Sequence, residues 1–297
     1  MKSRQRTRGA RFWGPIVFAV VVAALALEVG LFLGLGRGGA AAETTTALET
    51  SATSLLTTTT IETTTTIPVT TTAAADPTSP RTIGTSVQGR AIDLYTFGSG
   101  DWRVLIIGGI HGDELGGSVA QHFIEYLQQH PESVPAGTLV QVIPNANPDG
   151  LAAKTRGNAN KVDLNRNFPS PNWTSTLDST DLATRATKLT GGSSPGSEPE
   201  TKALLTVLDD GWDVVIALHS SGDVIDPDGE GARAIAKRMA YVSGLPVGGM
   251  IYQHAVTGSL GEYMPVVYKV PVVTVEVNVS RLSKGVRRAL LTALVKE

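Results

Sequence analysis

Short apolar runs alternate with amphipathic segments from Thr82 to the C-terminus. Runs such as VLII at 104–107 and VVIAL at 214–218 are apolar at consecutive positions, which is typical of strands buried on both faces. The pattern predicts strands within residues 102–109, 138–144, 213–220 and 271–279, and helices within residues 116–130, 198–210, 232–244 and 285–297. Strands that alternate with helices in this way predict an α/β fold with a mixed, largely parallel central sheet and helices on both faces.

The first 42 residues follow a different pattern. Five basic residues precede an apolar stretch, Ile16–Leu35, in which Glu28 is the only charged residue. About 20 apolar residues are enough for a helix to cross a membrane, and the basic flank should stay in the cytoplasm. We therefore expect a single-pass anchor in the cell membrane, with the rest of the chain outside. Ala40–Ala42 also offer a small-residue cleavage site, so secretion after signal cleavage is the alternative.

Threonine dominates residues 43–81, where no helical or strand period could build a core. We expect a disordered stalk there, and a folded domain over residues 82–297. Residues 1–42 hold six of the 25 basic and one of the 27 acidic residues, so the rest carries 19 basic and 26 acidic residues, a net charge of −7. Such a surface does not suit nucleic acid as a partner. The chain has no cysteine, so the exported domain depends on its own core.

Side chains that can bind a metal follow three of the predicted strands. His111 and Glu114 come after the first strand, His219 ends the third, and Glu276 lies in the fourth. Ligand sites in open α/β sheets lie at the carboxyl ends of the strands, which would bring these residues to one edge. Two histidines and a carboxylate suffice for a catalytic zinc ion, which keeps its fourth position for water. Glu276 would then be free to act as general base, the alternative being an outward-facing strand residue.

The stretch NANPDGLAAKTRGNANKVDLNRNFPSPNW, residues 145–173, carries the most specific motifs. Its NPDG, RGNAN and VDLNRNFP segments resemble the M14 family of zinc carboxypeptidases. Within that family they are most similar to the bacterial murein tripeptide amidases, which cleave the γ-D-glutamyl bond to meso-diaminopimelate. SEPETKAL at 197–204 and TGSLGEY at 257–263 also resemble that subgroup. The resemblance covers essentially all of residues 82–297.

For the metal site, the resemblance implies that His111, Glu114 and His219 bind one Zn²⁺ ion per domain. It also implies that Glu276 is the general base. Asp163 would accept a hydrogen bond from the His111 imidazole and so fix its tautomer.

For substrate binding, the resemblance implies roles for four further positions. Arg156 would polarise the scissile carbonyl and stabilise the oxyanion, which suits a fixed guanidinium charge. Asn165 and Arg166 would bind a carboxylate of the substrate. Tyr252 resembles the mobile tyrosine of the animal carboxypeptidases and would contact the substrate.

An acidic run of four residues, Asp223, Asp226, Asp228 and Glu230, follows His219. The run lacks the full spacing of an EF-hand calcium loop. A solvated loop is therefore the favoured interpretation.

These observations predict a membrane-tethered or secreted zinc peptidase that hydrolyses an amide bond in cell-wall peptides, with a peptide or muropeptide as substrate. Two alternatives stay open. The first is an exported metallocarboxypeptidase that removes C-terminal L-amino acids. It stays open because the murein amidases typically act in the cytoplasm, whereas this chain is expected outside the cell. A catalytically inactive module would bind wall peptides in the same cleft without turnover.

Overall fold

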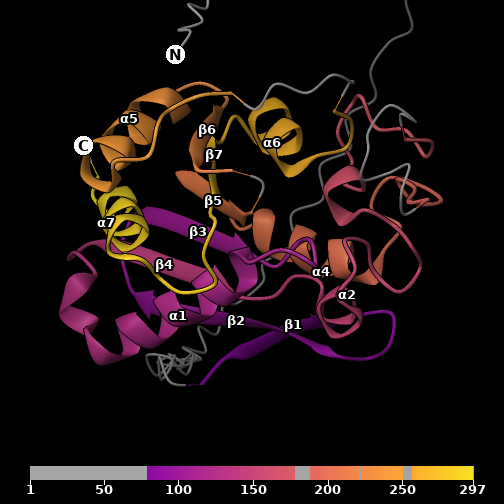
Figure 1. Cartoon of the computed structure of the whole chain (residues 1–297), viewed down its shortest axis with the longest axis horizontal. Coiled ribbons are helices and arrows are strands. Elements are labelled where there is room, and N and C mark those ends of the chain that lie inside the picture. Colours follow the sequence, from indigo (N-terminus) through magenta and orange to yellow (C-terminus); the bar gives the residue numbers. More distant parts are fainter. Residues whose placement is uncertain (1–78, 178–187, 221, 250–255, 297) are drawn as a thin grey trace, which may run out of the picture. The chain divides into compact units, whose positions relative to one another are not determined.

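Seven strands form one mixed sheet in the described part of the chain (Figure 1). The computed structural model describes residues 79–177, 188–220, 222–249 and 256–296, all within the unit Pro68–Glu297. The strands are β1 Arg81–Thr85, β2 Ala91–Gly98, β3 Trp102–Gly108, β4 Thr138–Ile143, β5 Val214–His219, β6 Val224–Asp228 and β7 Val272–Glu276, in the order β1-β2-β4-β3-β5-β7-β6. The central strands β4, β3, β5 and β7 are parallel, whereas β1, β2 and β6 pair antiparallel. The predicted mixed sheet is confirmed.

Helices cover both faces of this sheet, as predicted (Figure 1). They are α1 Gly116–Gln129, α2 Pro148–Ala153, α4 Pro199–Leu208, α5 Ala232–Ser243, α6 Leu260–Tyr263 and α7 Lys284–Ala293, with short 3-10 helices at Pro131–Ser133 and Leu164–Arg166 and a π-helix at Met264–Tyr268. Helices α1, α5 and α7 share one hydrophobic core with one face of the sheet. Helices α4 and α6 share a second core with the other face.

Strand β3 shows why the central strands have no polar face. Val104 and Ile106 pack into the core that contains α1, whereas Leu105 and Ile107 pack into the core that contains α4. All four side chains are fully buried. Each such aliphatic side chain stabilises the fold by about 1.5–3 kcal/mol relative to an exposed position, which explains the consecutive apolar residues.

The parallel strands β3, β5 and β7 end at one edge of the sheet. Strand β5 ends at His219, which pairs in register with Glu276 at the end of β7. The loop between β3 and α1 carries His111 and Glu114 to the same edge. The convergence that the sequence predicted for this edge is therefore present.

Gly112 and Gly116 let the β3–α1 loop and the start of α1 approach neighbouring backbone more closely than a residue with a Cβ atom could. A Cβ atom at Gly112 would lie 1.9 Å from the carbonyl carbon of Gly150 at α2. A Cβ atom at Gly116 would lie 2.0 Å from the carbonyl oxygen of Leu218 in β5. Because both distances are far below van der Waals contact, these two positions require glycine.

The prediction of a solvated loop for the acidic run was wrong for Asp226 and Asp228, whereas Asp223 and Glu230 are exposed and lie outside the strand, as predicted. Residues 224–228 form strand β6, which pairs antiparallel with β7. Ile225 is fully buried in the core that contains α5, and Asp226 and Asp228 point to the other face of the strand. Asp226 and Asp228 look like loop residues in sequence because they line a cavity that forms only on folding.

Several predicted features lie outside the described residues. They are the membrane-spanning segment at Ile16–Leu35, nearly all of the threonine-rich segment 43–81, and Tyr252. Within the part of the chain that the structure describes, no helix is long and apolar enough to cross a membrane.

Candidate functional site

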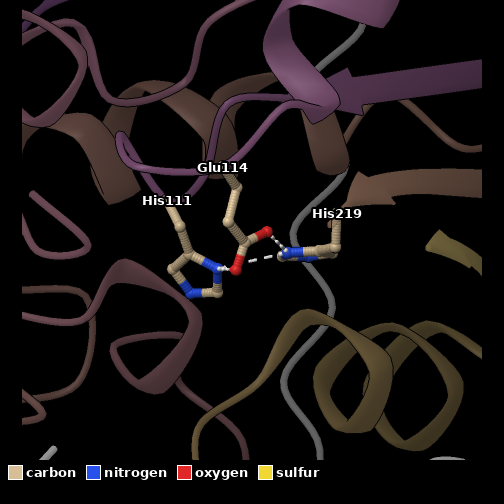
Figure 2. A group of neighbouring side chains, drawn as sticks. All are labelled: His111, Glu114 and His219. Atoms are coloured by element: carbon tan, nitrogen blue, oxygen red, sulfur yellow. Dashed lines mark hydrogen bonds and ion pairs between the residues drawn. The ribbon is translucent and has the colours of Figure 1, made fainter. Parts of the chain in front are cut away.

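His111, Glu114 and His219 bring their polar atoms to one point at the edge of the sheet (Figure 2). Nδ1 of His111 lies 2.7 Å from Oε1 of Glu114, and Nδ1 of His219 lies 2.9 Å from Oε2. The two Nδ1 atoms are 3.2 Å apart. Imidazole lone pairs and a carboxylate repel one another at such distances unless a proton or a cation lies between them. The three residues therefore fit a divalent cation, and their donor set is the one that zinc prefers.

Asp163 and Arg156 hold this cluster from one side. Nε2 of His111 lies 3.1 Å from Oδ1 of the fully buried Asp163, so a proton on Nε2 leaves the Nδ1 lone pair facing the cluster. Arg156 donates from Nε to Oδ2 of Asp163 at 2.9 Å and from a terminal nitrogen to Oε1 of Glu114 at 3.1 Å. The backbone N–H of Ser220 donates to Oε2 of Glu114 at 3.1 Å. The predicted contact between Asp163 and His111 is present.

The charges of the cluster are strongly coupled. Burial raises the pKa of Glu114, but the neighbouring His111 and His219 outweigh burial and hold this pKa far below its usual range. Burial also raises the pKa of Asp163, and Arg156 and His111 reverse this effect. Burial and Arg156 lower the pKa of His111, yet the carboxylates of Glu114 and Asp163 leave it raised. Both carboxylates are thus ionised at neutral pH, as a metal ligand and its hydrogen-bonding partner require.

Glu276 faces a cavity of about 420 Å³ that is shared with His111, Glu114 and His219. It is only 4% exposed, which excludes the alternative of an outward-facing strand residue. Thr274, two residues earlier on β7, lines the same cavity, as the period of a strand requires. Glu276 is therefore placed to act on a group bound at the cluster.

Asn165 and Arg166 line the same cavity from the 3-10 helix Leu164–Arg166. Asn165 accepts a hydrogen bond from the backbone N–H of Leu260 at 2.9 Å, which fixes its side chain. Arg166 is 5% exposed and donates to the backbone oxygen of Asn165 at 2.8 Å. Among the described residues, no carboxylate forms an ion pair with Arg166. Its guanidinium can therefore bind a carboxylate that enters the cavity.

Three further acidic residues form an acidic wall of the cavity, and their function could not be predicted from the sequence. Asp226 and Asp228 come from β6, and Glu262 comes from α6. Burial, together with the negative charges of Asp226 and Glu262, raises the pKa of Asp228 to about 7. The alternation in VIDPD at 224–228, with both aspartates on one strand face, was the signal that could have revealed this acidic wall.

Asp113, which lies between His111 and Glu114 in sequence, does not line the cavity. It is exposed and lines a separate hollow beside α2. Tyr252 lies outside the described residues, and its substrate contact stays a prediction.

Comparisons with known proteins agree with this geometry. The family model described as zinc carboxypeptidase matches residues 67–228. Murein peptide amidase A of Vibrio campbellii is 35% identical over 142 residues, covering 46% of this chain and 55% of that protein. Murein peptide amidase A of Escherichia coli K12 is 37% identical over 113 residues, covering 35% of this chain and 43% of that protein. The chain thus spans about half the length of these relatives.

A solved structure extends the likeness over the described domain. The crystal structure of the murein-tripeptide amidase from Escherichia coli O157 aligns with a TM-score of 0.58 and 27% identity, over 74% of this chain and 91% of that chain. The structural match therefore reaches well beyond the segments that align in sequence.

Proposed function

The chain belongs to the zinc carboxypeptidase family, and we propose that it hydrolyses an amide bond in cell-wall peptides, with the γ-D-glutamyl bond to diaminopimelate as its target. The observation that carries this proposal is the convergence of His111, Glu114 and His219 on the cavity that Glu276 and Arg156 also line. The likeness to murein peptide amidases supports the choice of substrate.

Different residues of the cavity would carry out different parts of the reaction. Zinc held by His111, Glu114 and His219 would supply a Lewis acid that polarises the scissile carbonyl and lowers the pKa of water. Glu276 would accept a proton from the attacking water and return it to the leaving amine.

The arginine and asparagine side chains would orient the substrate and stabilise charge. Arg156 would stabilise the oxyanion that develops on the scissile carbonyl, and Glu114 and Asp163 already fix its guanidinium for this task. Arg166 and Asn165 would hold a carboxylate of the leaving residue. The leaving residue would thus be ordered before reaction, which lowers the entropic part of the barrier.

The acidic wall supports a leaving residue that carries a positive charge. Diaminopimelate carries an ammonium group and a second carboxylate at the far end of its side chain, in addition to the carboxylate beside the scissile bond. Asp226, Asp228 and Glu262 would face the ammonium group, while Arg166 would bind the carboxylate. A C-terminal lysine or arginine would satisfy the same wall, and this is why an exported carboxypeptidase is the second candidate.

A comparison of substrates tests the proposal. The purified full-length chain would be incubated with L-alanyl-γ-D-glutamyl-meso-diaminopimelate, and with peptides that end in L-lysine or L-leucine, and the products followed by mass spectrometry. We expect release of diaminopimelate at the highest kcat/KM and stoichiometric zinc in the protein. Faster release of lysine would favour the exported carboxypeptidase. Peptide binding without turnover, in zinc-loaded protein, would identify an inactive binding module.

We also propose that residues 1–42 anchor the enzyme in the cell membrane, with residues 43–81 as a stalk and the catalytic domain outside. The apolar length of Ile16–Leu35 and its basic flank support this arrangement. Membrane fractionation followed by N-terminal sequencing tests it. An intact N-terminus in the membrane fraction is expected, whereas a soluble form that begins just after Ala42 would identify a cleaved signal.

A further inference from the structure

Two buried carboxylates stand at the start of α4, away from the cavity. Glu198 is 4% exposed and Glu200 is fully buried. Among the described residues, neither forms an ion pair with a lysine or an arginine. Burial of a charge is costly unless hydrogen bonds compensate for it, and the N-terminus of a helix also favours negative charge. Hydrogen-bond donors must therefore compensate for the burial of both charges.

Asn158 supplies a donor to both carboxylates. Its Nδ2 atom donates to Oε2 of Glu198 at 2.8 Å and to Oε2 of Glu200 at 3.0 Å. Its Oδ1 atom accepts from the backbone N–H groups of Asn160 and Val162, both at 3.1 Å. The two backbone donors fix the orientation of the amide, because only its oxygen can accept from them. The side chain thus ties α4 to the segment that follows Arg156.

The segment held by Asn158, residues 157–162, lies between two residues of the candidate active site. Arg156 and Asp163 flank it and bind each other at 2.9 Å. Arg156 continues to Glu114, and Asp163 continues to His111. A shift of the segment would therefore move the oxyanion-stabilising group and the partner of a metal ligand together.

We propose that Glu200, acting through Asn158, is a positioning residue that sets Arg156 and Asp163 against the metal cluster. This inference rests on the proposed function. Glu200 is remote from the reacting atoms, since it does not line the cavity. Its influence passes through one buried amide and a segment without regular helix or strand, whose conformation depends on these hydrogen bonds.

The two glutamates differ in a way that gives a matched control. Oε1 of Glu200 accepts from the backbone N–H of Val87 at 3.0 Å, and its Oε2 accepts from Asn158, so both oxygens face obligate donors. Oε1 of Glu198 instead faces the hydroxyl of Ser197 at 2.7 Å, which can donate or accept. A glutamine amide can therefore bond to Ser197 at position 198, whereas at position 200 it must face another N–H group.

The test compares Glu200→Gln with Glu198→Gln in the full-length chain. We expect Glu200→Gln to lower kcat on the tripeptide by about 10-fold or more with little change in KM, because Arg156 acts mainly in the transition state. The same variant should weaken zinc binding, measured by chelator competition, by about 10-fold, as loss of order around a metal ligand does. Glu198→Gln should stay within about 2-fold of wild type in all three quantities.

A double-variant cycle tests whether Glu200 acts through Arg156. In an Arg156→Ala background, Glu200→Gln should lower kcat by clearly less than in the wild type, because one of the two groups that it positions is gone. Equal losses in both backgrounds would overturn the inference. So would a Glu200→Gln protein that melts at a lower temperature but keeps its kcat and zinc affinity when folded, since that result describes a purely structural role.

The remaining outcomes separate the inference from the proposed function. If the wild type cleaves no amide substrate, the proposed function fails, and zinc affinity still decides the inference. Equal zinc affinities in the two glutamine variants would then overturn it. If Glu200→Gln does not fold, Asn158→Ala replaces it, with the same expected losses, because it removes the link while keeping both glutamates.

Discussion

At the scale of single residues, Glu276 has the most specific expected effect. Glutamine at this position has the same size but cannot accept a proton from water, so Glu276→Gln should lower kcat by at least about 100-fold. Zinc content should stay unchanged, because Glu276 is not one of the three clustered residues. Steady-state kinetics on the tripeptide, with metal analysis of the same samples, check both expectations.

Glu262→Gln is the matched control for that variant. Glu262 lines the same cavity from α6, in the acidic wall, where we expect it to bind the substrate and take no part in proton transfer. Its replacement should raise KM while kcat changes little. If Glu276→Gln kept more than a tenth of the wild-type kcat, Glu276 would not be the general base.

Asp228 should make stability depend on pH in a defined direction. Burial and the charges of Asp226 and Glu262 raise its pKa to about 7 in the folded state, above the ordinary 3.8. Between these two values the folded state binds more protons than the unfolded state, so the free energy of unfolding falls as the pH rises. Asp228→Asn removes this loss. Relative to wild type, it should gain about 2–3 kcal/mol between pH 5 and pH 8, since each pKa unit corresponds to about 1.4 kcal/mol.

Denaturant unfolding of both proteins at pH 5, 6.5 and 8 measures that difference, because contributions of unchanged groups cancel. Asp101→Asn is a suitable control, since Asp101 is exposed and does not line the cavity. A constant difference between Asp228→Asn and wild type across this range would show that Asp228 titrates as an ordinary carboxylate.

At the scale of elements, the contact between α1 and β5 determines the distance between Glu114 and His219. Gly116 begins α1, and a Cβ atom there would lie 2.0 Å from the carbonyl oxygen of Leu218, directly before His219. Gly116→Ala should therefore push α1 away from β5, weaken zinc binding, and destabilise the fold by about 1–3 kcal/mol. Chelator competition and thermal unfolding measure the two effects.

Gly248→Ala is the control for that prediction. A Cβ atom at Gly248 would meet only a methyl group of Val224 at 3.5 Å, which is an ordinary contact. Alanine should be tolerated there without loss of zinc affinity. If both variants bound zinc as tightly as the wild type, the close approach of α1 to β5 would not control the geometry of the cluster.

The elements also show how far sequence reasoning reaches. The strands β3 and β5 could be predicted because burial on both faces leaves consecutive apolar residues, and β7 because its valines alternate with Thr274 and Glu276. Their parallel order brings His111, His219 and Glu276 to one edge. Strand β6 could not, because its aspartates read as solvent-facing until a cavity exists for them to line. The sequence pattern of one strand does not show which distant residues will surround it in the fold.

Contacts between side chains that are distant in sequence could not be predicted for the same reason. The contact from Asn158 to Glu198 and Glu200 joins positions about 40 residues apart, and no period or turn signal relates them. The family motifs that contain these residues could be identified, but the reason for their residue types became visible only in the folded chain. The ends of β3, β5 and β7 could be predicted from the sequence, whereas the link from Asn158 to Glu198 and Glu200 became visible only in the fold.

At the scale of the whole molecule, metal binding and folding should be coupled. His111, Glu114 and His219 come from the β3–α1 loop and from β5, so they meet only in the folded state. An ion that binds the folded state alone stabilises it by about 2.7 kcal/mol at 100 times its Kd. Removal of zinc by a chelator should therefore lower the melting temperature, and added zinc should restore it, as scanning calorimetry can measure.

Two variants separate this stabilisation from catalysis. Glu276→Gln should be inactive but should still gain stability from zinc, because it keeps the three clustered residues. His219→Ala should lose both its activity and its stabilisation by zinc. The substitution removes one of the two Nδ1 atoms, from His111 and His219, that lie 3.2 Å apart in the cluster. If zinc stabilised His219→Ala as much as wild type, the ion would bind elsewhere on the chain. The edge of the sheet would then be only a polar cavity, and the assignment of the metal site would have to be abandoned.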